Sequence, residues 1–121
     1  MRRAFGVATA LVVFVGCSIA SAAGFQEGTY DVRGTNLDGS PYNGTARVYF
    51  ISNTTCSITW VTGSTSSSGV CMLMDGVLGV AYSDGSAVGV VMYKINADGT
   101  LDGVWTVAGK NGSGTERLIP R

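Results

Sequence analysis

From residue 28 onward, apolar and polar positions alternate with a period of two within short segments. The segments are rich in Val, Tyr, Thr, Ile and Trp, which favour extended strands. No stretch of this region repeats apolar residues at i, i+3, i+4 and i+7 over a helical length, so no helix is predicted there. The predicted strands are 28–35, 42–51, 55–62, 67–74, 77–82, 86–94, 101–108 and 113–119.

Turn signals separate these segments. Asp-Gly and Asn-Gly pairs between alternating segments are the strongest local indication of a hairpin. They begin at Asp38, Asn43, Asp75, Asp84, Asp98, Asp102 and Asn111, and not every one must be a turn, since the pairs at Asn43 and Asp102 lie inside predicted strands. Eight short strands joined by hairpins predict an all-β antiparallel meander. Such a meander closes into a small up-and-down barrel, because closure removes both unpaired edges. A flattened β-sandwich is the alternative.

The first 23 residues have the pattern of a secretory signal peptide. Arg2 and Arg3 form the positive start, and 4–15 is an apolar stretch. An A-x-A site follows, which predicts cleavage near Ala22 or Ala23. The apolar stretch is short for a transmembrane span of about 20 residues. We therefore expect a secreted or periplasmic protein with a single domain at 24–121.

Cys17 offers an alternative mode of processing. With the three residues before it, Cys17 resembles a bacterial lipobox, although Phe14 stands where Leu is usual. In that case Cys17 would carry acyl chains that anchor the mature protein. Otherwise it leaves with the signal peptide.

The remaining two cysteines predict a disulfide. An even pair in an exported chain is most simply a bridge, so Cys56 and Cys71 are expected to bond. Pairing them across a hairpin fixes the register and places Ile58 opposite Gly69. The tip of the hairpin then falls at 62–65, which is an acceptable loop length. The bridge and the turn signal agree independently.

Composition excludes several functions. The chain has no histidine, so a catalytic triad lacks its usual base, and the disulfide leaves no free thiolate. After cleavage, six basic and eight acidic residues remain, a net charge of −2 that gives nucleic acid no electrostatic footing. No metal or cofactor is predicted, and we expect no enzymatic activity. Asn36, Asp38 and Ser40 lack the spacing of an EF-hand, and turn chemistry explains Asp38 better than calcium does.

Aromatic residues are the remaining candidates for a binding site. The alternation puts Trp60 on one face with Cys56 and Ile58, and Tyr82 on one face with Leu78 and Val80. Aromatic residues in a small barrel are more often core than ligand contacts. If the barrel has an open interior, the candidate ligand-binding residues are Trp60, Tyr82, Tyr93 and Trp105.

The mature region also resembles a known group of sequences. The motifs that carry the resemblance are Gly28–Thr35, Tyr42–Ala46, Thr55–Trp60, Gly69–Met72, Asp98–Trp105 and Gly112–Glu116. They are similar, over about residues 25–121, to small exported β-proteins of alphaproteobacteria that carry the name "fibronectin-binding protein". The resemblance implies a protein of the bacterial envelope or the extracellular space. It brings no catalytic or binding residues with it.

Three functions follow as hypotheses. The first is an exported, non-catalytic binding module for an extracellular protein such as fibronectin. The second is an avidin-like or lipocalin-like carrier of a small ligand, since eight strands enclose just enough space for one. The third is a periplasmic inhibitor of a hydrolase. Whether side chains fill the barrel decides between the second hypothesis and the others.

Overall fold

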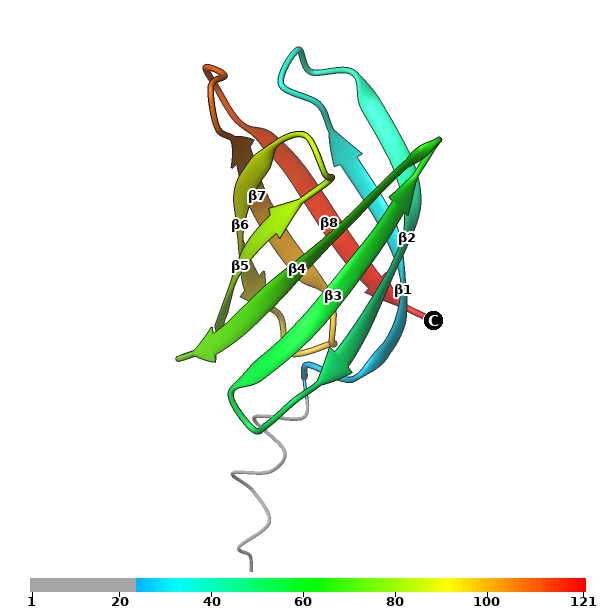
Figure 1. Cartoon of the computed structure of the whole chain (residues 1–121). Helices are drawn as coiled ribbons and strands as arrows, with labels where there is room; N and C mark the ends of the chain where they lie inside the picture. The colour runs from blue at the N-terminus through cyan, green and yellow to red at the C-terminus, as the bar shows by residue number, and fades with distance from the viewer. Residues whose placement is uncertain (1–23) are drawn as a thin grey trace, which may run out of the picture.

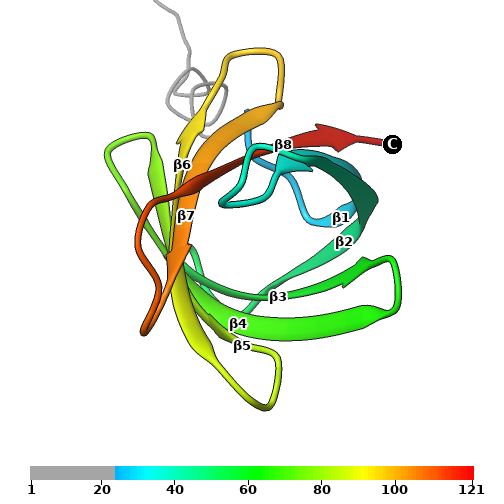
Figure 2. The same cartoon turned by 90° about the horizontal axis from the view of Figure 1, so that it is seen from above.

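The computed structural model describes residues 24–121, and the predicted signal peptide with Cys17 lies outside them. Eight antiparallel strands form a closed barrel in sequence order, and β8 pairs with β1 (Figures 1 and 2). The strands are β1 (Gly28–Thr35), β2 (Pro41–Phe50), β3 (Thr55–Thr62), β4 (Thr65–Met74), β5 (Val77–Ser83), β6 (Val88–Ile95), β7 (Leu101–Val107) and β8 (Gly114–Pro120). The predicted up-and-down barrel is confirmed, and every predicted strand lies within two residues of an observed one.

The hairpin of β3 and β4 follows the register expected from the cysteines. Cys56 lies opposite Cys71, and Ile58 lies opposite Gly69. The two cysteines form a disulfide with a Cα–Cα distance of 4.9 Å, and both are buried inside the barrel. The strands pair as far as Thr62 and Thr65, so β4 begins two residues earlier than predicted. The tip is therefore a two-residue turn whose Gly63 has a φ of 63°.

Local side-chain chemistry shapes the other turns. Asp75 and Gly76 both have positive φ, 53° and 78°, as a two-residue hairpin with the strand twist requires. Asp38 instead accepts hydrogen bonds from the backbone N–H and the hydroxyl of Ser40, at 2.9 and 2.6 Å. Asp98 makes the same pair of bonds to Thr100. The hydrogen bonds of the Asp38 side chain are therefore those of a turn, as the sequence predicts.

Inward-facing glycines give aromatic rings room to lie against the barrel wall. Tyr82 pairs directly with Gly89, and a Cβ at Gly89 would approach its ring to 2.3 Å. Gly103 stands in the same relation to Tyr93, and Gly114 to Trp105. In a tightly curved sheet, glycine allows the strand to bend, and the aromatic ring of the paired residue covers the backbone at the glycine. Gly79 differs from these glycines, since its nearest neighbour is the outward side chain of Met92.

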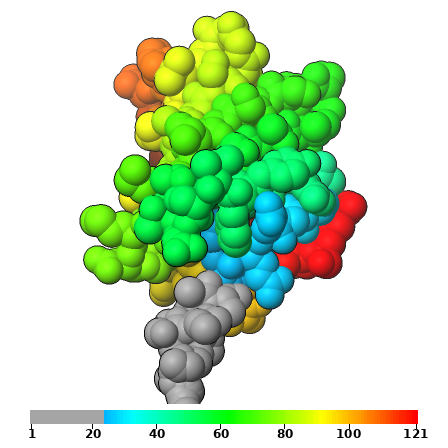
Figure 3. Space-filling view, turned by 60° about the horizontal axis from the view of Figure 1, so that its bottom comes forward, coloured from blue at the N-terminus to red at the C-terminus, as the bar shows by residue number. Residues whose placement is uncertain are grey.

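Apolar side chains fill one half of the barrel. At the end nearest residue 24, fully buried aliphatic residues pack around the disulfide; they include Val32, Val48, Ile58, Leu78, Leu101 and Leu118. Phe25 covers this end and packs on Phe50 with a ring-centroid distance of 5.4 Å. Figure 3 turns this end forward and shows the blue atoms of 24–35 packed between the green and the red parts of the chain. We call this half the closed end.

Among the residues of the barrel domain, no helix is both long and apolar enough to cross a membrane.

Candidate functional site

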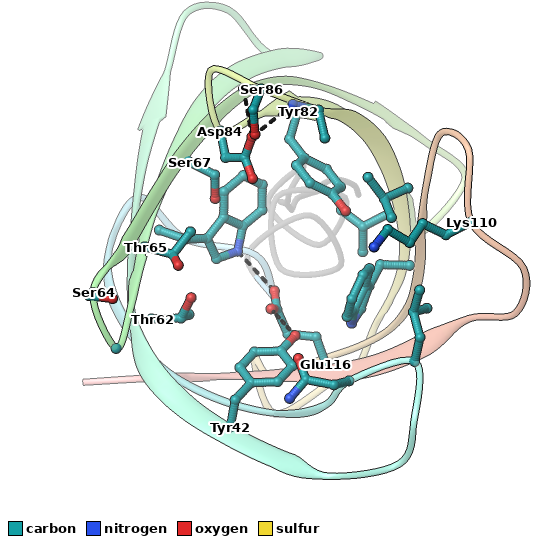
Figure 4. A pocket seen from close by; sticks show the side chains of 18 of the residues that line it. Tyr42, Thr62, Ser64, Thr65, Ser67, Tyr82, Asp84, Ser86, Lys110 and Glu116 are labelled. Carbon is teal, nitrogen blue, oxygen red and sulfur yellow. Dashed lines mark hydrogen bonds between the residues drawn. The ribbon is translucent and has the colours of Figure 1, made fainter.

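The other half of the barrel is hollow. A cavity of about 1070 Å³ opens among the loops that join β1 to β2, β3 to β4, β5 to β6 and β7 to β8. Its wall combines aromatic rings with hydroxyl and charged side chains (Figure 4). The side chains used below are Tyr42, Trp60, Ser67, Tyr82, Trp105, Lys110 and Glu116, with Asp38 and Asp84 at the mouth. This volume is close to the upper limit of about 1,000 Å³ for pockets that hold small organic molecules.

Three of the four candidate residues from the sequence line this cavity. Trp60 from β3, Tyr82 from β5 and Trp105 from β7 all point inward. Tyr93 is completely buried beneath the cavity and is not part of its wall. Its hydroxyl supports the wall from below by a hydrogen bond to Glu116. Tyr93 therefore supports a residue of the cavity wall, whereas Trp60, Tyr82 and Trp105 lie where a ligand could contact them.

Glu116 is the polar centre of the site. It is only 7% exposed, and its carboxylate accepts hydrogen bonds from three side chains. The indole N–H of Trp60 donates to Oε2 at 2.8 Å, and the hydroxyl of Tyr93 donates to the same oxygen. The hydroxyl of Tyr42 donates to Oε1 at 2.7 Å. Three donors around one carboxyl group match its ionised form, which can only accept.

The hydrogen bonds of Glu116 hold the aromatic wall in place. The Trp60 ring meets the Tyr82 ring edge to face, with centroids 5.7 Å apart. Tyr42 and Trp105 form a second edge-to-face pair with centroids 6.3 Å apart. The hydroxyl of Tyr82 donates to the backbone oxygen of Thr106, which anchors this ring to β7. Two fixed aromatic pairs therefore line one cavity, and Glu116 binds one member of each.

Charged side chains surround the mouth. Asp84 accepts hydrogen bonds from the backbone N–H groups of Ser86 and Ala87, both at 2.9 Å. These bonds lower the pKa of Asp84, and those from Ser40 lower the pKa of Asp38. Lys110 reaches from the loop between β7 and β8, and Figure 4 shows its side chain directed toward the cavity. The site therefore carries three carboxylates and one ammonium group.

Glu116 and Tyr42 were not predicted from the sequence as members of the site. Alternation could have placed Glu116 on the inner face, since Gly114 and Leu118 share that face in β8. Nothing local indicates that it meets Trp60, which lies 56 positions away. Tyr42 is 74 positions from Glu116 in the chain. The two residues meet because β1 pairs with both β2 and β8, so only one strand lies between theirs.

Four buried or partly buried tyrosines are expected to make the barrel sensitive to alkaline pH. Burial raises the pKa of Tyr42, Tyr82 and Tyr93, and the Glu116 charge raises each further; burial also raises the pKa of Tyr30. A group whose pKa is higher in the folded than in the unfolded state contributes its full stabilisation at pH values below its unfolded pKa, here about 10. That contribution to the free energy of unfolding is lost as the pH rises through the pKa of the folded state.

We expect the urea midpoint to fall steeply above about pH 10. Tyrosinate absorbance from these four residues should appear together with loss of the far-ultraviolet circular dichroism signal. The chain unfolded in urea is the control and should titrate its tyrosines near pH 10. Ionisation of all the tyrosines near that pH in a still-folded barrel would contradict the assignment.

No cluster of three or more His, Cys, Asp or Glu side chains suited to a metal ion occurs in the part of the chain that the structure describes.

Comparison with known proteins gives the fold. No family model and no curated protein matches the chain. Among solved structures it is similar to a barrel described as EF1p2_mFAP2b bound to DFHBI, with 16% identity, 84% of this chain and 98% of that one covered, and a TM-score of 0.72. A redesigned barrel, mFAP1, also bound to DFHBI, has 17% identity, 84% and 99% coverage and a TM-score of 0.68.

A fluorescence-activating β-barrel designed de novo has 16% identity, 83% and 97% coverage and a TM-score of 0.64. At such identities the likeness concerns the path of the backbone alone. It shows that this chain has the architecture of a small eight-stranded β-barrel.

Proposed function

We propose that this protein is an exported, non-catalytic carrier of a small organic ligand, in the manner of a lipocalin or avidin. The observation that carries the proposal is the cavity of about 1070 Å³, walled by two aromatic pairs above a buried carboxylate. Concave sites with apolar and aromatic walls and a few placed polar groups are typical of small-molecule binding.

The similar barrels support the proposal. Two of them are described as bound to DFHBI, so a barrel with a similar backbone can hold a small molecule. Here the closed end is packed and the opposite half is hollow, which leaves a fixed core beneath a binding space. The Cys56–Cys71 disulfide favours an oxidising compartment and hence export.

Absent catalytic groups support a non-catalytic function. The chain has no histidine, and the carboxylates of Asp38 and Asp84 are engaged in their own turns. Glu116 accepts three hydrogen bonds that fix its position. These bonds hold the carboxylate at the cavity wall, where it can contact a ligand.

Ligand binding can be followed without any label on the protein. The chain has two tryptophans, Trp60 and Trp105, and both line the cavity. Titration with an uncharged flat dye, the benzothiazole analogue of thioflavin T that lacks the methyl group on its ring nitrogen, should quench their fluorescence. Saturation at micromolar dye would support a binding cavity, and the absence of any saturable change would contradict it.

A matched pair of variants locates the bound dye. Ser67 lines the cavity, whereas Ser66, the residue before it in β4, is exposed and points to the outside. Ser67→Phe fills part of the cavity and should weaken dye binding at least tenfold, about 1.4 kcal/mol. Ser66→Phe adds the same ring to the outer wall and should leave the affinity unchanged. Equal effects of the two variants would place the dye outside the barrel.

A second candidate function uses the outer wall. Large apolar side chains are exposed on the adjacent strands β4 to β7; they are Val70, Met72, Met74, Val77, Val88, Val90, Met92 and Val104. An apolar surface of this kind is typical of protein contact sites. It favours binding of an extracellular protein such as fibronectin, although none of the comparisons concerns fibronectin. Surface plasmon resonance on immobilised fibronectin tests this candidate, and no binding at micromolar protein would exclude it. Hydrolase inhibition stays a prediction from sequence.

A further inference from the structure

We propose that the ligand of the cavity is an organic cation, an aromatic or alkyl ammonium compound whose positive group lies between the aromatic rings and Glu116. This inference rests on the proposed carrier function and adds the chemical class of the ligand. Three features of the site support it: its charge, its aromatic wall and the unused acceptor capacity of Glu116.

The charge of the cavity is negative. Glu116 lies at its floor and Asp38 and Asp84 at its mouth, and Lys110 is the one basic side chain in the lining of this cavity. The turn hydrogen bonds to Asp38 and Asp84 favour their ionised forms, so both remain charged well below neutral pH. The lining thus carries a formal charge of about −2, and a concave site concentrates its field on a bound ion.

The aromatic wall suits the same ligand. Trp60, Tyr82, Tyr42 and Trp105 all line the cavity, and each ring belongs to an edge-to-face pair. The face of an aromatic ring carries partial negative charge and attracts a cation, most strongly for Trp and where water is excluded. Aromatic cages of this kind are typical of sites for quaternary ammonium groups. An anionic ligand would gain no such attraction from aromatic rings.

Glu116 retains room for one more donor. Its Oε2 accepts from both Trp60 and Tyr93, whereas Oε1 accepts from Tyr42 alone. A carboxylate oxygen can accept two hydrogen bonds, so Oε1 has one position left, and Glu116 is part of the cavity wall. An ammonium N–H of a ligand could donate to this position, and a quaternary ammonium group could lie against Oε1 with favourable charge.

Two dyes of nearly the same shape and different charge test the proposal. Thioflavin T is a cation, and its uncharged analogue lacks one methyl group. Both are titrated into the protein with tryptophan quenching as the readout, and anilinonaphthalene sulfonate serves as the anionic probe. We expect thioflavin T to bind about tenfold more tightly than the uncharged analogue. The preference should shrink in high salt because salt screens the charges of the site.

Two lysine variants separate local charge from net charge. Lys110→Gln removes the positive charge at the mouth and should tighten thioflavin T binding about two- to threefold. Lys94 is exposed near the closed end, where it pairs with Val77 and Asp102. Lys94→Gln makes the same change in net charge there and should leave the affinity unchanged. Equal effects of the two variants would overturn the proposal.

The carboxylate itself is tested by Glu116→Gln. This variant should weaken thioflavin T binding about tenfold more than it weakens binding of the uncharged analogue. Loss of both dyes' binding to a Glu116→Gln barrel of native circular dichroism would mean that Glu116 only holds the wall, which overturns the proposal.

Different results would contradict the carrier function and the cationic ligand. If the uncharged analogue binds the native protein as tightly as thioflavin T, the cation inference fails and the carrier function stands. If neither dye nor the anionic probe quenches the tryptophans in a saturable way, both fail.

Discussion

Replacing Glu116 with leucine is expected to lower the free energy of unfolding by about 3–4 kcal/mol, because it leaves buried donors without an acceptor. The N–H of Trp60 and the hydroxyl of Tyr93 both donate to Oε2, and these residues are 5% and 0% exposed. Each orphaned donor costs about 1–3 kcal/mol. Tyr42 is more accessible, so water from the cavity can replace its lost partner. Urea unfolding followed by circular dichroism measures the effect.

A second substitution in the same background distinguishes orphaned donors from lost packing. Tyr93→Phe removes one of the donors that Glu116→Leu leaves unsatisfied, so the double variant should be more stable than Glu116→Leu alone. Removing both partners of a buried hydrogen bond costs less than removing one. Glu116→Gln keeps the size of the side chain and one acceptor oxygen, and should be less destabilised than Glu116→Leu. Further loss of stability on adding Tyr93→Phe would contradict the explanation.

Removing the disulfide is expected to have an effect of similar size. The bridge joins residues 15 positions apart, and a loop of about this length gives about 3 kcal/mol of stabilisation through the unfolded chain. Replacing Cys56 and Cys71 together by serine should therefore cost about 2–4 kcal/mol and lower the melting temperature by about 10–20 °C. Differential scanning calorimetry under oxidising conditions measures both quantities.

Reduction provides the matched control for the disulfide. A thiol reductant should lower the melting temperature of the native protein and leave that of the serine variant unchanged. Both sulfur atoms are buried at the closed end, so a reductant does not reach them in the folded protein. The protein is therefore unfolded, reduced and refolded before its melting temperature is measured. A serine variant that melts at the same temperature as the oxidised native protein would show that the bridge contributes nothing.

Most of the backbone was predictable because its determinants are local. The Asp75-Gly76 pair specifies a two-residue hairpin through two positive φ angles, and Cys56 and Cys71 fix the register of β3 against β4. The extra pairs Val61–Ser66 and Thr62–Thr65 escaped prediction, since the sequence of the tip permits both a two-residue and a four-residue turn.

The candidate site was predictable only in part. Alternation places Trp60, Tyr82 and Trp105 on inward faces, as expected from their apolar neighbours on the same strands. Both faces of β6 are apolar, so alternation does not decide the direction of Tyr93, and burial beneath Glu116 separates this residue from the cavity. Depth along the barrel axis depends on the stagger of all eight strands, which no single segment contains.

The sequence by itself determined the strands, their order, the position of the hairpins and the disulfide, because each depends on residues close together in the chain. Only the tertiary structure decided that one half of the barrel is packed and the other hollow. That outcome depends on the combined volume of inward side chains from eight strands. It also depends on closure between β1 and β8, which carries Glu116 to Trp60 and Tyr42 across most of the chain.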